Sequence, residues 1–137
     1  MAAGRWKGVS AAGLALMLAA ALMPAAVRAD GPAGDPARGE QLFKRCRACH
    51  SVEPGRNKIG PSLYGVVGRK AGTAPGYAYS PALKGAEWVL TEEMLDKWIA
   101  GPKKVLPGTK MIFPGLPNPQ DRADVIAFLK QHGPAEK

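Results

Sequence analysis

The chain has 137 residues, a formal net charge of +8 and a hydrophobic content of 46%. A chain of this length is expected to form one domain, and a domain this small buries only a modest share of its surface. Three of the basic residues lie in an N-terminal segment that we expect to be removed, which lowers the formal charge of the remaining chain to +5. This modest surplus, in a chain with an export signal, argues against nucleic acid as a partner.

Residues 1–29 have the pattern of a secretory signal peptide. Arg5 and Lys7 precede an apolar stretch of 15 residues, Val9 to Met23, which is shorter than the roughly 20 residues of a membrane span. Cleavage after Ala29 would leave a mature domain of residues 30–137 in the periplasm. The alternative is a leader that is not cleaved and anchors the protein to the membrane.

A first helix is predicted near the start of the mature domain. Asp35 is a suitable N-cap, and Pro36 suits the first helical position. The helix is expected to run through Leu42 and Phe43 into the sequence Cys46-Arg47-Ala48-Cys49-His50.

This five-residue motif is the most specific feature of the chain. Two cysteines three positions apart, followed at once by a histidine, are typical of a c-type haem attachment site. Cys46 and Cys49 would each form a thioether with a haem vinyl group, and His50 would supply an imidazole to the iron. The chain has no other cysteine, so one covalent haem c would account for both thiols.

Two cysteines at this spacing have three other interpretations. A zinc site usually needs four ligands, and a second Cys/His pair is missing. A thioredoxin-like redox pair requires a βαβ setting that the sequence does not predict. A structural disulfide is possible in an exported protein. The histidine next to Cys49 favours haem over all three.

The rest of the chain predicts long loops and two further helices. Turn signals recur in 51–80 at Pro54-Gly55, Gly60-Pro61 and Pro75-Gly76. A loop this long in a small domain is normally functional, and wrapping a flat prosthetic group is one such function.

The second helix is expected over about 92–100, with Thr91 as N-cap and Gly101-Pro102 as its end. The third begins with Asn118 as N-cap and ends at Gly133-Pro134. An apolar stripe on this third helix is expected to face the core; it consists of Val125, Ile126, Phe128 and Leu129. The predicted class is all-α, with three main helices and long loops.

A sixth iron ligand could come from Met94, Met111 or His132. His132 lies near the C-terminus, where a solvated role is more usual, and Met94 lies inside the second predicted helix, where packing is more usual. Met111 lies in a loop bounded by Pro107-Gly108 and Pro114-Gly115, which could carry its thioether to the haem face opposite His50. Ligation by His and Met would raise the reduction potential and leave no open position on the iron.

The chain resembles the class I c-type cytochromes, close to the mitochondrial type and its bacterial periplasmic relatives. The resemblance covers nearly all of 35–131. The motifs that carry it are Gly39 and Phe43, Cys46-Arg47-Ala48-Cys49-His50, Gly60-Pro61-Ser62-Leu63, Gly65-Val66-Val67-Gly68-Arg69, Gly76-Tyr77-Ala78-Tyr79, Trp88, Pro107-Gly108-Thr109-Lys110-Met111 and 123–129.

This resemblance implies a small single-domain cytochrome c fold around one covalent haem c. It implies His50 and Met111 as axial ligands, and Pro61 as the acceptor of the imidazole N–H.

The resemblance also implies roles for residues around the haem and at the helix crossing. Arg69, Tyr79 and Trp88 would donate hydrogen bonds towards the haem propionates, and Gly39 would let the first and last helices cross closely. Trp98 stands where the family often has a tyrosine, and the spacing from Trp88 to the second helix is about two residues longer than in the mitochondrial form.

The predicted function is that of a soluble periplasmic one-electron carrier, expected as a monomer and not an enzyme. It would accept electrons from a quinol–cytochrome c reductase or a dehydrogenase and donate them to a terminal oxidase or reductase. Basic residues flank the two ligand segments and would steer the protein to acidic docking patches; they are Lys44, Arg45, Arg47, Lys103, Lys104 and Lys110. The alternative is a haem enzyme or ligand-binding haem protein, such as a peroxidase or gas sensor, with a displaceable sixth ligand.

Overall fold

The computed structural model describes residues 31–134 together with Met1 and Gly4. The described chain forms helices joined by long loops, in the order α1 (Pro36–Phe43), α2 (Pro81–Lys84), α3 (Glu92–Ala100), α4 (Pro102–Val105) and α5 (Pro119–Lys130). Residues 31–134 contain no strand, although an isolated antiparallel bridge pairs Lys70 with Val89. The predicted all-α class is confirmed. The predicted signal peptide, 1–29, lies outside the described residues apart from Met1 and Gly4.

The three main helices begin where the capping residues predict. Asp35, Thr91 and Asn118 precede α1, α3 and α5, and each accepts a hydrogen bond on its side chain from a backbone N–H of the first turn. Such caps satisfy N–H groups that have no partner within the helix. None of the helices in the described part of the chain is long and apolar enough to cross a membrane.

Two short helices and one helix end differ from the sequence prediction. The helices α2 and α4 have four residues each, which is too short to show a period in the sequence. Gly101 ends α3 as expected, but Pro102 then starts α4 at once. The helix α5 ends at Lys130, and Gln131 caps it before the predicted stop at Gly133.

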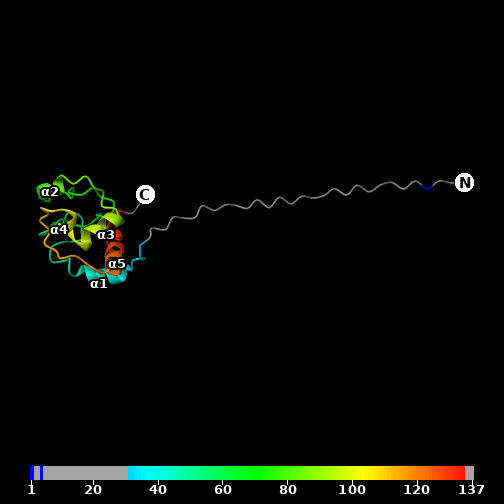
Figure 1. The fold of residues 1–137 in the computed structure, drawn as a ribbon, viewed down its shortest axis with the longest axis horizontal. Helices are drawn as coiled ribbons and strands as arrows, with labels where there is room; N and C mark the ends of the chain where they lie inside the picture. The colour runs from blue at the N-terminus through cyan, green and yellow to red at the C-terminus, as the bar shows by residue number, and fades with distance from the viewer. Residues whose placement is uncertain (2–3, 5–30, 135–137) are drawn as a thin grey trace.

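The helices α1 and α5 cross in direct contact (Figure 1). A Cβ atom on Gly39 would overlap the backbone oxygen of Asp124, so only glycine allows this approach. The rings of Phe43 and Phe128 pack at the same crossing, with centroids 5.1 Å apart. The predicted close crossing at Gly39 is confirmed.

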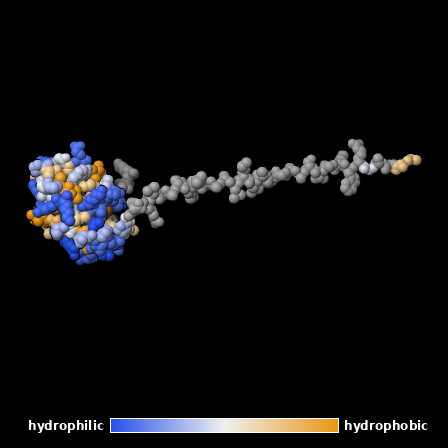
Figure 2. Space-filling model, viewed as in Figure 1, coloured by the Kyte–Doolittle hydropathy of each residue, from blue (hydrophilic) through white to orange (hydrophobic). Residues whose placement is uncertain are grey.

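The core lies between α1, α3 and α5. It consists of Phe43, Val66, Leu95, Leu116, Val125, Ile126, Phe128 and Leu129. The apolar stripe predicted on the last helix is therefore buried, as expected. On the face that Figure 2 shows, hydrophilic residues predominate and the hydrophobic areas are small.

A buried carboxylate ties the start of α1 to α5. Asp124 is fully buried, and its Oδ1 accepts hydrogen bonds from the backbone N–H of Asp35 and the amide of Gln120, both at 2.8 Å. The Nε atom of Arg38 lies 3.2 Å from Oδ2. Although burial opposes ionisation, these partners together hold the pKa of Asp124 below its usual value.

The substitution Gly39→Ala should destabilise the fold even though alanine is the better helix former. The added methyl group must push α1 away from the backbone of Asp124, and we expect a loss of about 2 kcal/mol in the free energy of unfolding. Denaturant unfolding of the haem-containing protein measures it. Gly85→Ala is the matched control, because Gly85 has a φ of −82° and its nearest neighbour would be at 3.5 Å. Equal stability of the two variants would contradict the crossing argument.

The substitution Asp124→Asn should lower stability at neutral pH by about 2 kcal/mol, because the hydrogen bond from Asp35 loses its charge assistance and the ion pair with Arg38 is lost. Since folding depresses the pKa of Asp124, its carboxylate stabilises the fold above the ordinary value of 3.8, and this contribution is lost as the pH falls below it. The gap between variant and parent should therefore close in acid. Asp121→Asn, which removes the half-buried partner of the exposed Arg38 in the same network, should cost less than about 1 kcal/mol. A gap that is constant with pH would refute this account.

Candidate functional site

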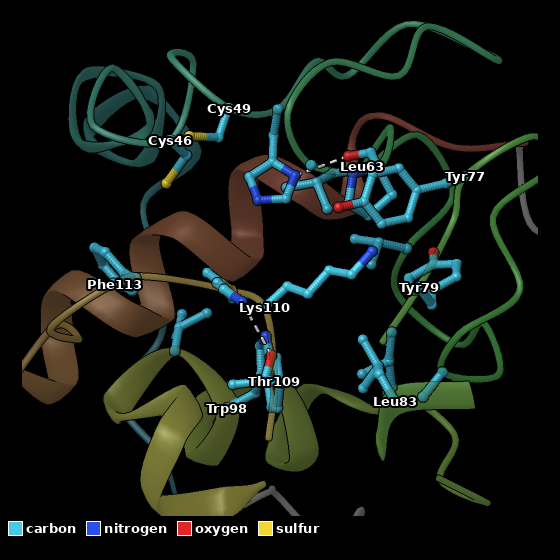
Figure 3. A pocket seen from close by; sticks show the side chains of 18 of the residues that line it. Cys46, Cys49, Leu63, Tyr77, Tyr79, Leu83, Trp98, Thr109, Lys110 and Phe113 are labelled. Atoms are coloured by element: carbon cyan, nitrogen blue, oxygen red, sulfur yellow. Dashed lines mark hydrogen bonds between the residues drawn. The ribbon is translucent and has the colours of Figure 1, made fainter. Parts of the chain in front are cut away.

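A cavity of about 650 Å³ opens beside the Cys46–His50 motif. Its walls come from the motif, the loops 59–72 and 77–83, α3, the segment 109–116 and α5, and they are mostly apolar. Figure 3 shows Cys46 and Cys49 on one side of this space and Tyr77 and Tyr79 on another. A volume of this size, with apolar walls and few polar groups, suits a small organic ligand or cofactor.

Both cysteines line the cavity, and no disulfide joins them. Burial raises the pKa of Cys46 to about 11, the neighbouring Cys49 adds to this effect, and Arg45 opposes it. A reactive redox dithiol needs a lowered thiol pKa, so this environment does not favour the thioredoxin-like interpretation. Among the described residues, no group of three or more His, Cys, Asp or Glu side chains is placed to hold a metal ion by itself.

The imidazole of His50 is held in one orientation. Its Nδ1 lies 2.7 Å from the carbonyl oxygen of Pro61, so Nδ1–H donates there and the lone pair of Nε2 is left available to a metal. A Cβ atom on Gly60 would overlap the imidazole ring, which means that the loop packs directly against it. Burial lowers the pKa of His50, and the Pro61 hydrogen bond opposes this shift while Lys58 adds to it. The ring is therefore kept neutral, the form that binds a metal.

Of the three candidate sixth ligands, only Met111 lines the cavity. Its backbone N–H donates to Oγ1 of Thr109 at 3.2 Å, which fixes the turn of the loop. Met94 lies half-buried on α3 and is not part of the cavity wall. The Nδ1–H of His132 donates to the carbonyl oxygen of Phe128 at 2.9 Å. The structure thus brings Met111, and neither alternative, to the same cavity as His50.

Two of the three residues predicted to face the propionates line the cavity. Arg69 donates to the carbonyl oxygens of Tyr64 and Ser62, but its buried Nε has no partner. Burial lowers the pKa of Arg69. The hydroxyl oxygen of Tyr79 accepts the N–H of Ala74 at 3.1 Å, which leaves its proton free for another acceptor. Both residues can therefore donate to an anionic group.

Trp88 is placed differently from the other predicted residues. It is not among the residues that line the cavity; its ring instead contacts that of Trp98, with centroids 6.0 Å apart. Trp98 is buried and forms part of the cavity wall. The predicted hydrogen bond from Trp88 stays a prediction, and Trp98 is the tryptophan nearer the site.

Two further residues link loops across the cavity. The hydroxyl of Tyr77 donates to the carbonyl oxygen of Ile59 at 2.8 Å. The Nζ of Lys110 donates to the carbonyl oxygen of Ala78 at 2.7 Å, and Figure 3 shows its side chain reaching towards Tyr77 and Tyr79. No role for Tyr77 is predicted from the sequence. Tyr77 and Tyr79 are two residues apart, and in an extended segment this spacing puts both side chains on the same side of the chain. That spacing is the sequence signal that could have placed Tyr77 beside Tyr79 at the cavity.

Comparison with known proteins agrees with this geometry. The Cytochrome c family matches residues 36–133. The chain is 56% identical over 103 residues to cytochrome c2 of Rhodomicrobium vannielii, an alignment covering 74% of this chain and 82% of that protein. It is 46% identical over 104 residues to cytochrome c of Ginkgo biloba, covering 74% and 92%. The solved structure of cytochrome cH from Methylobacterium extorquens superposes with a TM-score of 0.69 at 50% identity, covering 72% of this chain and 99% of that one.

These matches, with the fold and the cavity, define a class I c-type cytochrome. The chain belongs to the Cytochrome c family and is an electron carrier rather than an enzyme. The family implies one covalently bound haem c, for which Cys46 and Cys49 provide the attachment motif. The described residues fit this group, because the cavity is large and apolar, Nε2 of His50 is free, and the unpartnered Nε of Arg69 suits a carboxylate.

The double substitution Cys46→Ala with Cys49→Ala should leave the chain poorly folded. The cavity has the apolar walls and the volume that a covalent haem would fill, so loss of the attachment would remove much of the apolar core of a small domain. Circular dichroism and thermal melting of the variant, compared with the haem-containing parent, measure this effect. Native helicity and a cooperative melt in the variant would contradict it.

Proposed function

We propose that this chain is a periplasmic one-electron carrier in which His50 and Met111 are the axial ligands of the haem iron. The observation that carries the proposal is the convergence of four side chains on one cavity: Cys46, Cys49, His50 and Met111 all line it. They come from two segments far apart in the sequence, and no other candidate ligand reaches the same space. When bound, the haem iron supplies a reversible one-electron oxidation and reduction.

The protein side chains determine how this centre behaves. His50 is a neutral imidazole whose orientation Pro61 holds through the Nδ1–H hydrogen bond, so it can coordinate without rearranging. Met111 contributes a soft thioether, which favours the ferrous state and raises the reduction potential. If both His50 and Met111 bind the iron, no coordination position would remain open to a substrate. This arrangement supports electron transfer rather than haem enzymology.

The pocket residues complete this proposal. Arg69 and Tyr79 would donate to the haem propionates, for which the free Nε and the free phenolic proton are available. These donors would keep the negative charge of the propionates compensated inside a mostly apolar cavity. Trp88 would also donate its indole N–H towards a propionate, from its position against the ring of Trp98.

Exposed basic residues near the two ligand segments in the sequence support docking to acidic partners. The six basic residues predicted to flank the ligand segments are all exposed, and they are Lys44, Arg45, Arg47, Lys103, Lys104 and Lys110. Two of them, Arg45 and Lys110, line the cavity itself. We infer membrane redox complexes or periplasmic redox enzymes as partners, met as a monomer in fast and salt-sensitive encounters. The donor would be a quinol–cytochrome c reductase or a dehydrogenase, and the acceptor a terminal oxidase or reductase.

The predicted signal peptide supports the periplasmic location. The pattern of residues 1–29 predicts a signal peptide, and covalent haem attachment in bacteria takes place outside the cytoplasm. The similarity to bacterial proteins named cytochrome c2 agrees with this assignment.

The substitution Met111→Ala tests the proposed ligand. We expect the oxidised variant to lose the weak long-wavelength absorption band of Fe–Met ligation, the reduced variant to bind carbon monoxide, and the reduction potential to fall. Met94→Ala is the matched control, because Met94 is half-buried on α3 but does not line the cavity. Absence of the band from the parent protein, or its survival in the Met111 variant, would rule out Met111 as the ligand.

A further inference from the structure

A second cavity of about 520 Å³ lies on another face of α3 and α5. Its walls come from residues 31–34, the first turns of α3 and one side of α5, and we call it the outer groove. Ile126 and Ala127 of α5 line the outer groove, whereas Val125 and Leu129 of the same helix line the haem cavity. Residues three or four positions apart share a helix face, so the two cavities lie on different sides of α5. The proposed electron-carrier site makes no use of the outer groove.

The segment before α1 is fixed on α5 up to the edge of this groove. The side-chain amide of Gln120 donates to the carbonyl oxygen of Ala33 at 2.8 Å. A Cβ atom on Gly34 would overlap the carbonyl oxygen of Ala123, so the backbone of this segment rests directly on the helix. Figure 1 shows the segment in cyan beside α5. Residues 31–32, which come just before these contacts, line the groove.

The predicted signal cleavage would end the mature chain at this groove. Cleavage after Ala29 makes Asp30 the first residue, directly before Gly31. Hydrolysis of the peptide bond consumes one water and leaves a carboxylate on Ala29 and an α-ammonium on Asp30. Consecutive Cα atoms are about 3.8 Å apart, so the new ammonium would lie within about 5 Å of the Cα atom of Gly31. The processed chain therefore gains a positive charge beside the groove.

The charges that line the outer groove suit such a cation. Three acidic residues of α3 line it, and they are Glu92, Glu93 and Asp96. Two basic residues, Lys97 and Lys130, line it as well. The lining thus has one negative charge in surplus, which an α-ammonium would balance.

Glu93 is the carboxylate best suited to the new contact. The Nζ of Lys130 lies 2.5 Å from the carboxylate of Glu92. The Nε of Arg122 lies 2.6 Å from that of Asp96, so both neighbours of Glu93 already have a close cation. Glu93 is exposed, and a hydrogen bond from its own backbone N–H lowers its pKa, so it is ionised at neutral pH. A pair at this position would be sensitive to salt.

We propose that the outer groove receives the mature amino terminus, and that the α-ammonium created on Asp30 by signal cleavage pairs with Glu93 at the start of α3. The inference rests on the export that forms part of the proposed function. It gives cleavage a structural consequence, because the precursor has an uncharged peptide bond where the mature chain has the ammonium. The pair would join the amino terminus to α3, which also forms a wall of the haem cavity. The mature haem-containing protein would therefore be more stable than the same chain without the terminal charge.

Selective acetylation of the α-amino group tests the pair, because it removes the charge and little else. For the haem-containing mature protein we expect the thermal midpoint to fall by about 3 °C at low salt, and by less at high salt. Glu93→Gln should lower it by a similar amount, and acetylation of this variant should cause little further loss. Glu87→Gln is the matched control, because Glu87 is exposed but does not line the groove. In that control, acetylation should have its full effect.

A pair of glycine variants tests the position of the segment. Gly34→Ala should lift it from α5, so acetylation of this variant should change the midpoint little. Gly31→Ala should keep the full effect, since a Cβ atom there meets nothing within 4 Å. Asp30→Ser should also keep it, because the ammonium remains when the side-chain carboxylate is removed. If Gly34→Ala does not fold, the comparison with Glu93→Gln decides the matter.

Several results would overturn the inference. They are a midpoint that acetylation leaves unchanged, and losses from acetylation and Glu93→Gln that simply add. A dimer in sedimentation that Glu93→Gln dissociates would assign the groove to a second copy of the chain instead. Mass spectrometry of the periplasmic protein should give a chain that begins at Asp30, and any other start would remove the proposed ammonium. Absence of the Fe–Met absorption band from the same samples would overturn the proposed electron carrier separately, since the acetylation result does not depend on that band.

Discussion

The backbones of α1 and α5 meet at Gly39 without room for a side chain, and the position of the site depends on this contact. Because α1 leads directly into the haem motif, the packing of α1 against α5 places Cys46 and Cys49 at the cavity. The rings of Phe43 and Phe128 fill the space beside the crossing. Since α5 also packs on α3, one helix positions both the attachment segment and the opposite wall. A shift at the crossing would therefore move several parts of the site together.

The loops around the cavity have little core of their own and are joined by side-chain hydrogen bonds to carbonyl oxygens. His50 bonds to Pro61, Tyr77 to Ile59, and Lys110 to Ala78, so segments distant in the sequence are held around one space. Each bond contributes only about 1 kcal/mol net. Their joint effect is positional, because each bond limits the movement of a loop whose apolar side chains face the cavity. The haem then supplies the apolar contacts that these walls lack among themselves.

Much of the helical framework could be predicted from local chemistry. Asp35, Thr91 and Asn118 mark helix starts because capping depends only on residues within one turn. The helices α2 and α4 escaped prediction because four residues cannot display a helical period. The contact of Trp88 with Trp98, instead of the cavity, could not be foreseen either, since it depends on how the segment before α3 folds back on that helix.

The sequence by itself determined the attachment chemistry and the family, because covalent haem binding needs two thiols and an imidazole within five residues, and that spacing is local. It also singled out Met111 by the prolines and glycines around its loop. Only the tertiary structure decided which side chains share the cavity, and which stay outside it. The position of Trp88 belongs to this second class, because its ring contact with Trp98 joins two parts of the chain that no local pattern relates.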